Sequence, residues 1–395
     1  MSQTNTSLQT RSRYAAAAAR RPRILFLSND IAYLYNFRGA LMQAFRDKGY
    51  DVLAVAPPTN PQIETAIRAL KVDFEGWNLR KTGRNPFAEL NSILNLISVF
   101  RRFRPDIFFG YTIKPVLYGT LISHALGVSR RVVMITGLGY AFLPGGGMAK
   151  TLIREIVLMG YRFALKRSSL AIFQNQDDID LFRQLSLLSD QAPVAKVNGS
   201  GVDVNRFAAT PLPPGPPRFL LVARLLRDKG IHEYVEAARI VQRKLPQTQF
   251  VLVGEPDSNP AAVPWRDIET WIAEGVIEYR GHLDDPYPEF RAAHVFVLPS
   301  YREGTPRTCL EAMSSGRAII TTDVPGCRAT VQDGENGLLV PARDAAALAD
   351  AMLRLAENLE LTGVMGARGR QIAEEKFDLR KVAEYTVNLI EGNGT

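Results

Sequence analysis

Two α/β domains, each with a mostly parallel sheet, are the fold that the sequence predicts. In both halves of the 395-residue chain, short apolar runs typical of buried parallel strands alternate with helical patterns. Between the halves, the segment TPLPPGPP at 210–217 cannot join a sheet interior and is typical of a linker. We therefore expect a first domain at 23–209 and a second at 218–376, with ligands bound in the cleft between them.

The first half alternates regularly from its first apolar run onward. Its expected strands lie at 23–28, 50–57, 106–111, 131–137 and 169–175. Its expected helices lie at 37–48, 61–71, 85–103 and 150–166. Gly49 marks the end of the first of these helices.

The second half repeats this alternation after the linker. Its expected strands lie at 218–223, 249–255, 276–281, 294–300 and 318–323. Asp344 is a favourable N-cap for the helix that follows it. A last helix at 379–391 places Val382, Tyr385 and Leu389 on one apolar face.

Composition indicates a globular protein of a reducing compartment, which we expect to be the cytoplasm. The chain is 46% hydrophobic and 22% charged, and no apolar run reaches the roughly 18–20 residues of a membrane-spanning helix. Cys309 and Cys327 are too few for a disulfide framework and lack metal-site spacing. The alanine run within residues 1–22 is too short and too weakly apolar for a signal peptide, so we expect a flexible basic tail there.

Charge is distributed unevenly between the halves. Residues 1–210 carry 27 Lys and Arg against 14 Asp and Glu, while the remainder carries 21 against 26. A basic half favours an anionic partner, and nucleic acid, an acidic membrane surface and phosphorylated substrates all fit. Basic amphipathic segments at 97–105 and 150–167 suit either a helix on anionic lipid or a core helix with a basic solvent face.

The most informative segment is PSYREGTPRTCLEAMSSG at 299–316, in which seven residues separate two glutamates. Pro306 can open a helix that Gly316 ends, which leaves Glu303 in the loop and Glu311 about 7–8 Å along the helix axis. Because a helix N-terminus favours phosphate, a diphosphate there would leave a sugar near Glu303 and a ribose near Glu311. The alternative is a loop acid and a solvated helical acid.

Two cations in the same half suit that diphosphate. Arg224 and Lys229 follow a strand and precede a helix expected near Ile231. A planar guanidinium and a compact ammonium could clamp a diphosphate and neutralise a leaving nucleotide. A solvated basic turn is the alternative, and the glutamate pair farther along the same domain favours the clamp.

Other common sites are not supported. There is no G-x-G-x-x-G with an acidic partner, no P-loop and no convincing Ser/His/Asp order. The four histidines lack metal-site spacing and are expected to be structural or on the surface: His124, His232, His282 and His294. The adjacent aspartates at 177–178 and 284–285 are expected to be solvated, so we expect no metal.

Three expected loops follow strands of the first half, at 29–38, 111–118 and 136–147. They should line one edge of one sheet. Arg38, expected at a helix start, and Lys114 could meet an acceptor phosphate, while Tyr140 and Phe142 could stack on a sugar or touch lipid. Glycines in the third loop would let its backbone approach a ligand.

At this point the sequence resembles retaining glycosyltransferases of family four, which have the GT-B fold. The resemblance covers nearly all of 23–391 and rests on GSGVDVNRF, VARLLRDKG, VLVGE, FVLPSYREGTPRTCLEAMSSGRAIITTDVPGC and ENGLLV. In the first half, FLSND…YNFRGAL, YTIKPVLYG and MITGLGYAF resemble a subgroup that builds bacterial surface glycans. That subgroup includes enzymes adding an N-acetylhexosamine to lipid-diphosphate-linked diacetylbacillosamine.

The resemblance implies two Rossmann-like domains with parallel sheets facing a central cleft, and a helix within 377–395 that crosses back to the first domain. It implies transfer of a hexose unit, with retention, from a UDP-sugar to a polyprenyl-diphosphate-linked saccharide in the assembly of surface glycans or glycoprotein glycans. The leaving diphosphate itself would take the acceptor proton, so no enzymic base is expected. Because members of this family generally need no metal for catalysis, neither a metal nor a cofactor is expected.

Roles for individual residues follow from the same resemblance. The catalytic set would be Glu303 at the donor sugar with Arg224 and Lys229 at the diphosphate. The donor would further contact Glu311 at the ribose, Gly304, Thr305 and Pro306 near the sugar, and Gly281, His282 and Leu283 near the base. The acceptor would contact Arg38, Thr112, Lys114, Gly137, Gly139 and Tyr140. Many relatives carry a histidine after the fourth strand, where this chain reads YTIKP, so Thr112 or Lys114 would substitute.

The expected partners are a nucleotide sugar, a lipid-linked acceptor and an anionic membrane surface, with the protein peripheral on the inner face of the cell membrane. One alternative is a GT-B enzyme with a soluble acceptor, or an epimerase. Another is a non-enzymatic nucleic-acid-binding protein, which the lack of a basic–aromatic recognition module disfavours.

Overall fold

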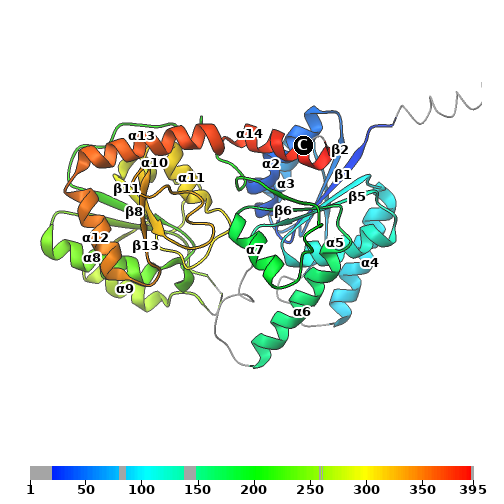
Figure 1. The fold of residues 1–395 in the computed structure, drawn as a ribbon, viewed down its shortest axis with the longest axis horizontal. Helices are drawn as coiled ribbons and strands as arrows, with labels where there is room; N and C mark the ends of the chain where they lie inside the picture. The colour runs from blue at the N-terminus through cyan, green and yellow to red at the C-terminus, as the bar shows by residue number, and fades with distance from the viewer. Residues whose placement is uncertain (1–19, 80–85, 138–147, 258, 260, 393–395) are drawn as a thin grey trace, which may run out of the picture.

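A computed structural model of the protein describes residues 20–79, 86–137, 148–257, 259 and 261–392. Two parallel sheets, of seven and six strands, stand side by side with helices on both faces of each (Figure 1). The predicted fold class is therefore confirmed. Residues 1–19, which make up most of the expected tail, lie outside the described residues, and Arg20 hydrogen-bonds to Asp106 and to the carbonyl of Arg104.

The N-terminal sheet has the strand order β3-β2-β1-β4-β5-β6-β7. Its strands are β1 (Arg23–Leu27), β2 (Asp51–Ala56), β3 (Asp73–Gly76), β4 (Ile107–Tyr111), β5 (Arg130–Ile135), β6 (Leu170–Phe173) and β7 (Val194–Lys196). Its helices are α2 (Ile31–Asp47), α3 (Pro61–Ala69), α4 (Pro86–Phe103), α5 (Ile113–Ala125), α6 (Met148–Leu165) and α7 (Gln176–Gln184). Successive strands are added in one direction from β1 to β3 and in the other direction from β4 onward. Ligands of such parallel sheets bind at this switch point between β1 and β4.

The C-terminal sheet has the order β10-β9-β8-β11-β12-β13 and reverses between β8 and β11. Its strands are β8 (Arg218–Val222), β9 (Gln249–Val253), β10 (Glu278–Tyr279), β11 (Val295–Leu298), β12 (Ala318–Thr322) and β13 (Gly337–Val340). The short 3₁₀ helix η2 (Arg227–Lys229) precedes α8. The helices are α8 (Ile231–Lys244), α9 (Trp265–Ala273), α10 (Tyr287–Ala292), α11 (Arg307–Ser314), α12 (Ala345–Ala356), α13 (Leu359–Lys376) and α14 (Leu379–Glu391).

Local signals explain where several helices begin. Asp344 caps α12 as predicted, since its carboxylate accepts from the main-chain N–H of Ala347 at 2.9 Å. The prediction that the first helix starts near Arg38 is wrong. Asp30 caps α2 by accepting from two main-chain N–H groups at 2.8 and 3.0 Å, so the helix begins at Ile31 and Arg38 lies within it.

The expected loop at 111–118 is instead mostly helix α5. Its proline, Pro115, lies in the first helical turn, where the missing N–H removes no intrahelical hydrogen bond. Thr112 precedes the helix with φ +67°, a backbone conformation that few threonines adopt. The strand-to-helix connection at this sheet edge is therefore tighter than the sequence suggested.

Helix α14 crosses back and packs on α2 of the N-terminal domain (Figure 1). Val387 and Ile390 join the core of that domain. Tyr385 does not belong to the buried face, because 51% of it is exposed, so this part of the prediction is wrong. The buried face turns toward the smaller residues Ala383 and Thr386, which line a cleft against α2.

Candidate functional site

A cavity of about 380 Å³ opens between the two domains. On the N-terminal side it is lined by Tyr33, Phe37, Arg38, Tyr111, Thr112, Thr136, Gln174 and Ser200. On the C-terminal side it is lined by Val222, Ala223, Arg224, Lys229, Leu298 and residues 303–308. Because Tyr111 ends β4 and Leu298 ends β11, the cavity lies at the carboxyl edges of both sheets, where ligands of parallel sheets bind.

Lys229 and Glu303 form an ion pair inside this cavity. Lys229 Nζ lies 2.5 Å from Glu303 Oε1, and Ser300 Oγ donates to the same oxygen at 2.8 Å. Burial alone would lower the pKa of Lys229, but the charge and hydrogen bond of Glu303 outweigh it and raise the pKa. The ammonium is therefore charged, and it is paired with the Glu303 carboxylate.

Arg224 is the second cation on this wall. Its side chain is about half exposed, and it approaches Asp257 at 3.5 Å. With Lys229 it places two positive groups at the end of β8, as predicted. One is buried and preorganised, while the other is solvated and adjustable, and together they suit a diphosphate.

Glu311 lies behind this cavity and does not line it. Only 6% of it is exposed, and Arg307 Nε donates to Glu311 Oε1 at 2.9 Å. Burial raises the pKa of Glu311, although the Arg307 charge opposes the shift. The structure thus places Arg307 between Glu311 and the cavity. Pro306 is the N-cap residue and Arg307 the first helical residue, one position later than predicted.

Arg307 was not predicted as a site residue, although its i,i+4 spacing to Glu311 is visible in the sequence. It also donates to the carbonyl of Asn36, and its guanidinium lies 5.4 Å from the centre of the Phe37 ring. Arg307 therefore joins the carboxylate of α11 to the N-terminal domain. Only the tertiary structure brings these groups together.

Arg38 is a buried cation on the opposite wall. It is 3% exposed, donates to Ser200 Oγ at 2.9 Å and lies 4.9 Å from the centre of the Tyr111 ring. Burial lowers its pKa to about 10, so it stays protonated at neutral pH. Among the described residues no carboxylate pairs with Arg38, and its Nε has no hydrogen-bond partner. An anion in the cavity would offset this buried charge.

A second cavity of about 360 Å³ adjoins the first. It is lined by Asn29, Leu79, Thr112, Ile113, Lys114, Thr136 and Gly137. Thr112 and Thr136 line both cavities, so the two meet there. The buried atoms Asn29 Oδ1 and Thr112 Oγ1 lack partners among the described residues, and Lys114 Nζ lies 2.6 Å from Glu89 Oε1. Asn29 was not predicted individually, although it lies in the expected loop at 29–38.

The residues predicted to lie near the base, Gly281, His282 and Leu283, do not line the first cavity. Gly281 O accepts from the N–H of Gly254 at 2.9 Å, which puts the segment Gly281, His282 and Leu283 at the same sheet edge beside β9. Gly139, Tyr140 and Phe142 lie outside the described residues. Of the histidines, His294 is buried and accepts from the N–H of Arg218 at 3.1 Å, consistent with a structural role.

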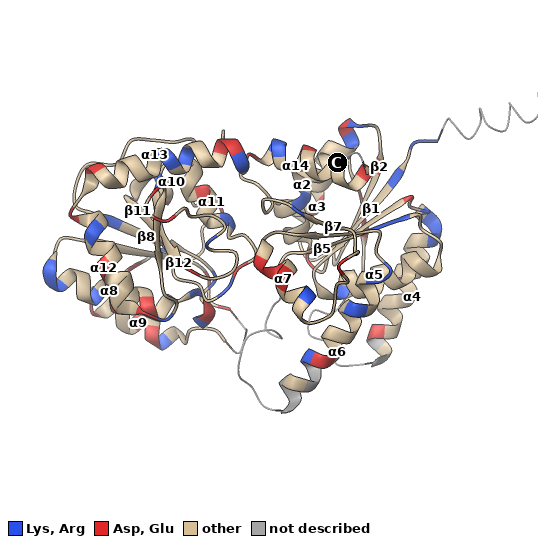
Figure 2. Cartoon of the chain, in the orientation of Figure 1, with Lys and Arg blue, Asp and Glu red and all other residues tan. Residues whose placement is uncertain are grey.

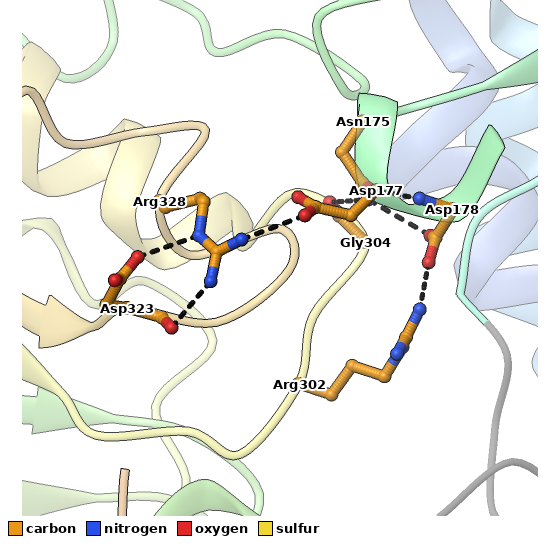
Figure 3. A network of polar contacts seen from close by, with 7 residues as sticks. All are labelled: Asn175, Asp177, Asp178, Arg302, Gly304, Asp323 and Arg328. Atoms are coloured by element: carbon orange, nitrogen blue, oxygen red, sulfur yellow. Dashed lines mark hydrogen bonds and ion pairs between the residues drawn. The ribbon is translucent and has the colours of Figure 1, made fainter. Parts of the chain in front are cut away.

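The prediction that Asp177 and Asp178 are solvated is wrong for Asp178, whose side chain is fully buried. Asp178 pairs with Arg302, and Asp177 lies 2.8 Å from Arg328, so two arginines of the C-terminal domain reach the first turn of α7 (Figure 3). The acidic end of α7 faces that domain in Figure 2. Within the described parts of the chain, no cluster of His, Cys, Asp or Glu is arranged to hold a metal.

Comparison with known families matches most of the chain. Residues 216–358 match the family described as glycosyl transferases group 1. Residues 23–175 match the family described as glycosyl transferase 4-like. The second match covers β1 to β6 of the N-terminal sheet, and the first covers the whole C-terminal sheet together with Lys229, Glu303 and Glu311.

Curated relatives align over much of their length. An N,N'-diacetylbacillosaminyl-diphospho-undecaprenol alpha-1,3-N-acetylgalactosaminyltransferase from Campylobacter jejuni is 26% identical across 93% of this chain and 98% of its own. The capsular polysaccharide biosynthesis glycosyltransferase CapM from Staphylococcus aureus is 24% identical across 78% of this chain and 83% of its own.

Solved structures agree on the architecture. Sucrose-phosphate synthase from Thermosynechococcus elongatus superposes with a TM-score of 0.77 at 21% identity, over 95% of this chain and 99% of its own. HepE from Anabaena, solved in complex with UDP and glucose, superposes with a TM-score of 0.75 at 17% identity, over 94% and 100%. At these identities the agreement concerns the fold.

Proposed function

Because the chain belongs to the group 1 glycosyl transferases of family four, which are retaining enzymes, we propose that it moves a hexose unit from a UDP-sugar to a polyprenyl-diphosphate-linked saccharide. The transferred unit is proposed to be an N-acetylhexosamine, as in the Campylobacter jejuni relative's name. UDP is proposed because the HepE structure contains it. The observation that carries the proposal is the cavity between the sheets, in which Lys229, Arg224 and Glu303 meet.

The donor diphosphate would bind Lys229 and Arg224. It would compete with Glu303 for the Lys229 ammonium, which frees a Glu303 oxygen to accept from a sugar hydroxyl. As the bond to the sugar breaks, negative charge grows on the diphosphate, and a fixed buried cation stabilises that charge without reorganising. The acceptor oxygen would bond to the anomeric carbon on the same face of the sugar, and its proton would pass to the departing diphosphate oxygen, so no base from the protein is needed.

The acceptor would enter through the second cavity. Thr112 and Thr136 stand where the two cavities meet, which is where an acceptor hydroxyl has to reach the sugar. The oxygens of Asn29 and Thr112, which have no partner among the described residues, would accept from or donate to its hydroxyl groups once a small side-chain movement exposes them. Backbone strain such as that at Thr112 tends to persist where a precise side-chain position matters.

The test is transfer of label from nucleotide sugars. UDP-[¹⁴C]N-acetylhexosamine is incubated with the protein and either bacterial lipid extract or a soluble saccharide. We expect label in the lipid fraction, lost with Glu303→Ala and kept with the exposed control Glu360→Ala. Label that enters only soluble products, or an epimerised nucleotide sugar, would favour the soluble-acceptor or epimerase alternative.

Membrane contact is proposed from exposed apolar side chains on three neighbouring helices of the N-terminal domain. These side chains are Phe87, Leu90, Leu94, Leu121, Ile156, Met159 and Phe163. On α4 and on α6 they follow i, i+3, i+7 spacing, and α5 contacts both helices (Figure 1). Exposed cations lie farther along the same helices, at Arg101, Arg102 and Arg162, and just beyond the end of α6 at Lys166. Apolar side chains beside cations suit an anionic bilayer surface, here the inner face of the cell membrane.

Among the described helices none is both long and apolar enough to cross a bilayer, so the proposed contact is peripheral. We expect sedimentation with phosphatidylglycerol vesicles but not with phosphatidylcholine vesicles. The variant Leu90→Ser/Ile156→Ser/Met159→Ser should stay in the supernatant. The matched control Trp265→Ser/Ile272→Ser removes exposed apolar groups from α9 and should still sediment. If the unchanged protein and both variants are recovered equally in the supernatant, the membrane proposal is wrong.

A further inference from the structure

The donor loop, defined as residues 300–306, carries Glu303 between two walls. One wall belongs to its own domain. The N–H of Glu303 donates to the carbonyl of Pro325 at 3.1 Å, and a Cβ atom on Gly326 would lie 2.2 Å from Glu303 O. The backbone of Glu303 is therefore closely packed against Pro325 and Gly326 of its own domain.

The other wall belongs to the N-terminal domain. Asn175 Nδ2 donates to Gly304 O at 2.8 Å. A Cβ atom on Gly304 would lie 2.1 Å from Thr136 O and 2.7 Å from Gln174 Oε1, so only glycine permits this approach. The position of the donor loop thus depends on contact between the two domains.

Asp178 is the charged group of this second wall. Its buried carboxylate bonds to Arg302, the residue before Glu303, and accepts from Asn175 Nδ2 at 3.0 Å (Figure 3). Burial raises the pKa of Asp178, and Arg302 is the largest influence opposing that shift. Arg302 Nε has no partner among the described residues, so this guanidinium in turn relies on Asp178.

The neighbouring ion pair between Arg328 and Asp177 makes a useful contrast. It also joins the two domains, at 2.8 Å, but its side chains are 41% and 32% exposed. Arg328 is held as well by Asp323 and does not belong to the donor loop. Exposed pairs of this kind contribute little to stability. Both aspartates lie in the first turn of α7, so each interacts favourably with the helix dipole. That interaction therefore does not distinguish Asp178 from Asp177.

We propose that Asp178 is a positioning residue that holds the donor loop through Arg302, and so fixes the Glu303 carboxylate while the two domains are in contact. In this way a residue of the N-terminal domain determines the position of Glu303, which belongs to the C-terminal domain. This inference rests on the proposed function, because it takes Glu303 to contact the transferred sugar. Removing the Asp178 charge leaves the partly buried Arg302 guanidinium without its charged partner and lets Glu303 shift. A misplacement of about 1 Å near reacting groups costs on the order of 10²-fold in rate.

The test compares Asp178→Asn with the matched control Asp177→Asn. We expect Asp178→Asn to lower kcat by roughly 10²-fold while the Kd for UDP does not rise, because UDP lacks the sugar that Glu303 contacts. Asp177→Asn should keep both values. Equal losses in the two variants, or a loss of UDP affinity as large as the loss of kcat, would show a merely structural contact and overturn the positioning role.

A second background removes the other partner. In Arg302→Met protein, adding Asp178→Asn should lower kcat no further, because the link to the donor loop is already absent. A full additional loss there would mean that Asp178 acts on something else. If the unchanged protein transfers no sugar, both the proposed function and the positioning role of Asp178 are wrong. An active protein whose two aspartate variants behave alike would remove only the positioning role.

Discussion

In the C-terminal domain, Lys229 and Arg307 each bond a glutamate of that same domain, at 2.5 and 2.9 Å. In the N-terminal domain, Arg38 faces the same cavity with a serine hydroxyl, a backbone carbonyl and the face of a tyrosine ring as its neighbours. The two walls of one cavity therefore hold their cations in different ways. On one wall the positive charge is already neutralised, and on the other it is buried with no compensating carboxylate among the described residues.

This difference determines the free-energy change when an anion binds at each wall. An anion that reaches Lys229 must displace a carboxylate, so the gain in free energy is the difference between two good partners. An anion that reaches Arg38 offsets a desolvation cost that the folded protein already bears. The C-terminal wall is suited to selecting a particular ligand, and the N-terminal wall to stabilising whatever negative charge is brought or created next to it.

The largest expected effect comes from removing both cations at the end of β8. Arg224→Ala with Lys229→Ala should lower turnover by at least about 10³-fold, roughly 4 kcal/mol of transition-state stabilisation. It leaves the leaving diphosphate without neutralisation and Glu303 without its partner. Steady-state sugar transfer measures the effect, with Arg243→Ala/Lys244→Ala at the end of α8 as the control. Normal transfer by the first variant would contradict the assignment of the diphosphate site.

The second expected effect tests the uncompensated cation. Arg38→Gln should lower kcat/KM by roughly 10²-fold, because a buried charge facing the reaction is lost. It should not lower the midpoint of thermal unfolding, because the variant no longer buries an unpaired charge. Kinetics and calorimetry on the same sample measure both quantities, with exposed Arg68→Gln as the control. A variant that unfolds several degrees earlier but transfers sugar normally would mean that Arg38 serves the fold alone.

The smallest of the three effects concerns Glu311. Glu311→Ala should weaken donor binding about tenfold, or about 1.4 kcal/mol, if the ribose bonds to this carboxylate. The ligand would have to replace Arg307 there, just as it replaces Glu303 at Lys229. Calorimetric titration with UDP measures the affinity, and exposed Glu357→Ala is the control. Unchanged affinity would show that Glu311 instead holds Arg307 in place.

The donor loop of the C-terminal domain could be placed from the sequence because its residues are consecutive, although its partner Lys229 lies 74 residues upstream of Glu303. Glu303, Gly304, Thr305 and Pro306 lie on one strand-to-helix connection and line one cavity, and the Pro306 and Gly316 signals placed α11 to within one residue. Arg307 was missed because its importance comes from contacts with Asn36 and Phe37 of the other domain.

The N-terminal domain was harder to predict because its cavity residues come from several separate connections. Arg38 was predicted for the cavity and does line it, but at the wrong place on its helix, because the capping effect of Asp30 was overlooked. Tyr385 was placed on the buried face of α14 by its apolar character, whereas packing on α2 favours the smaller Ala383 and Thr386.

The sequence by itself determined the two parallel sheets, the bounds of several helices, including α3, α4, α6, α11 and α14, and the donor loop. All of these depend on interactions within a few residues: side-chain periodicity, capping and the restricted backbone of proline and glycine. Only the tertiary structure decided which charges meet. Asp178 and Arg302 are 124 residues apart, and Arg38 and Ser200 are 162 apart. Such pairings depend on how one domain is seated against the other, and that placement is set by surfaces that no local pattern encodes.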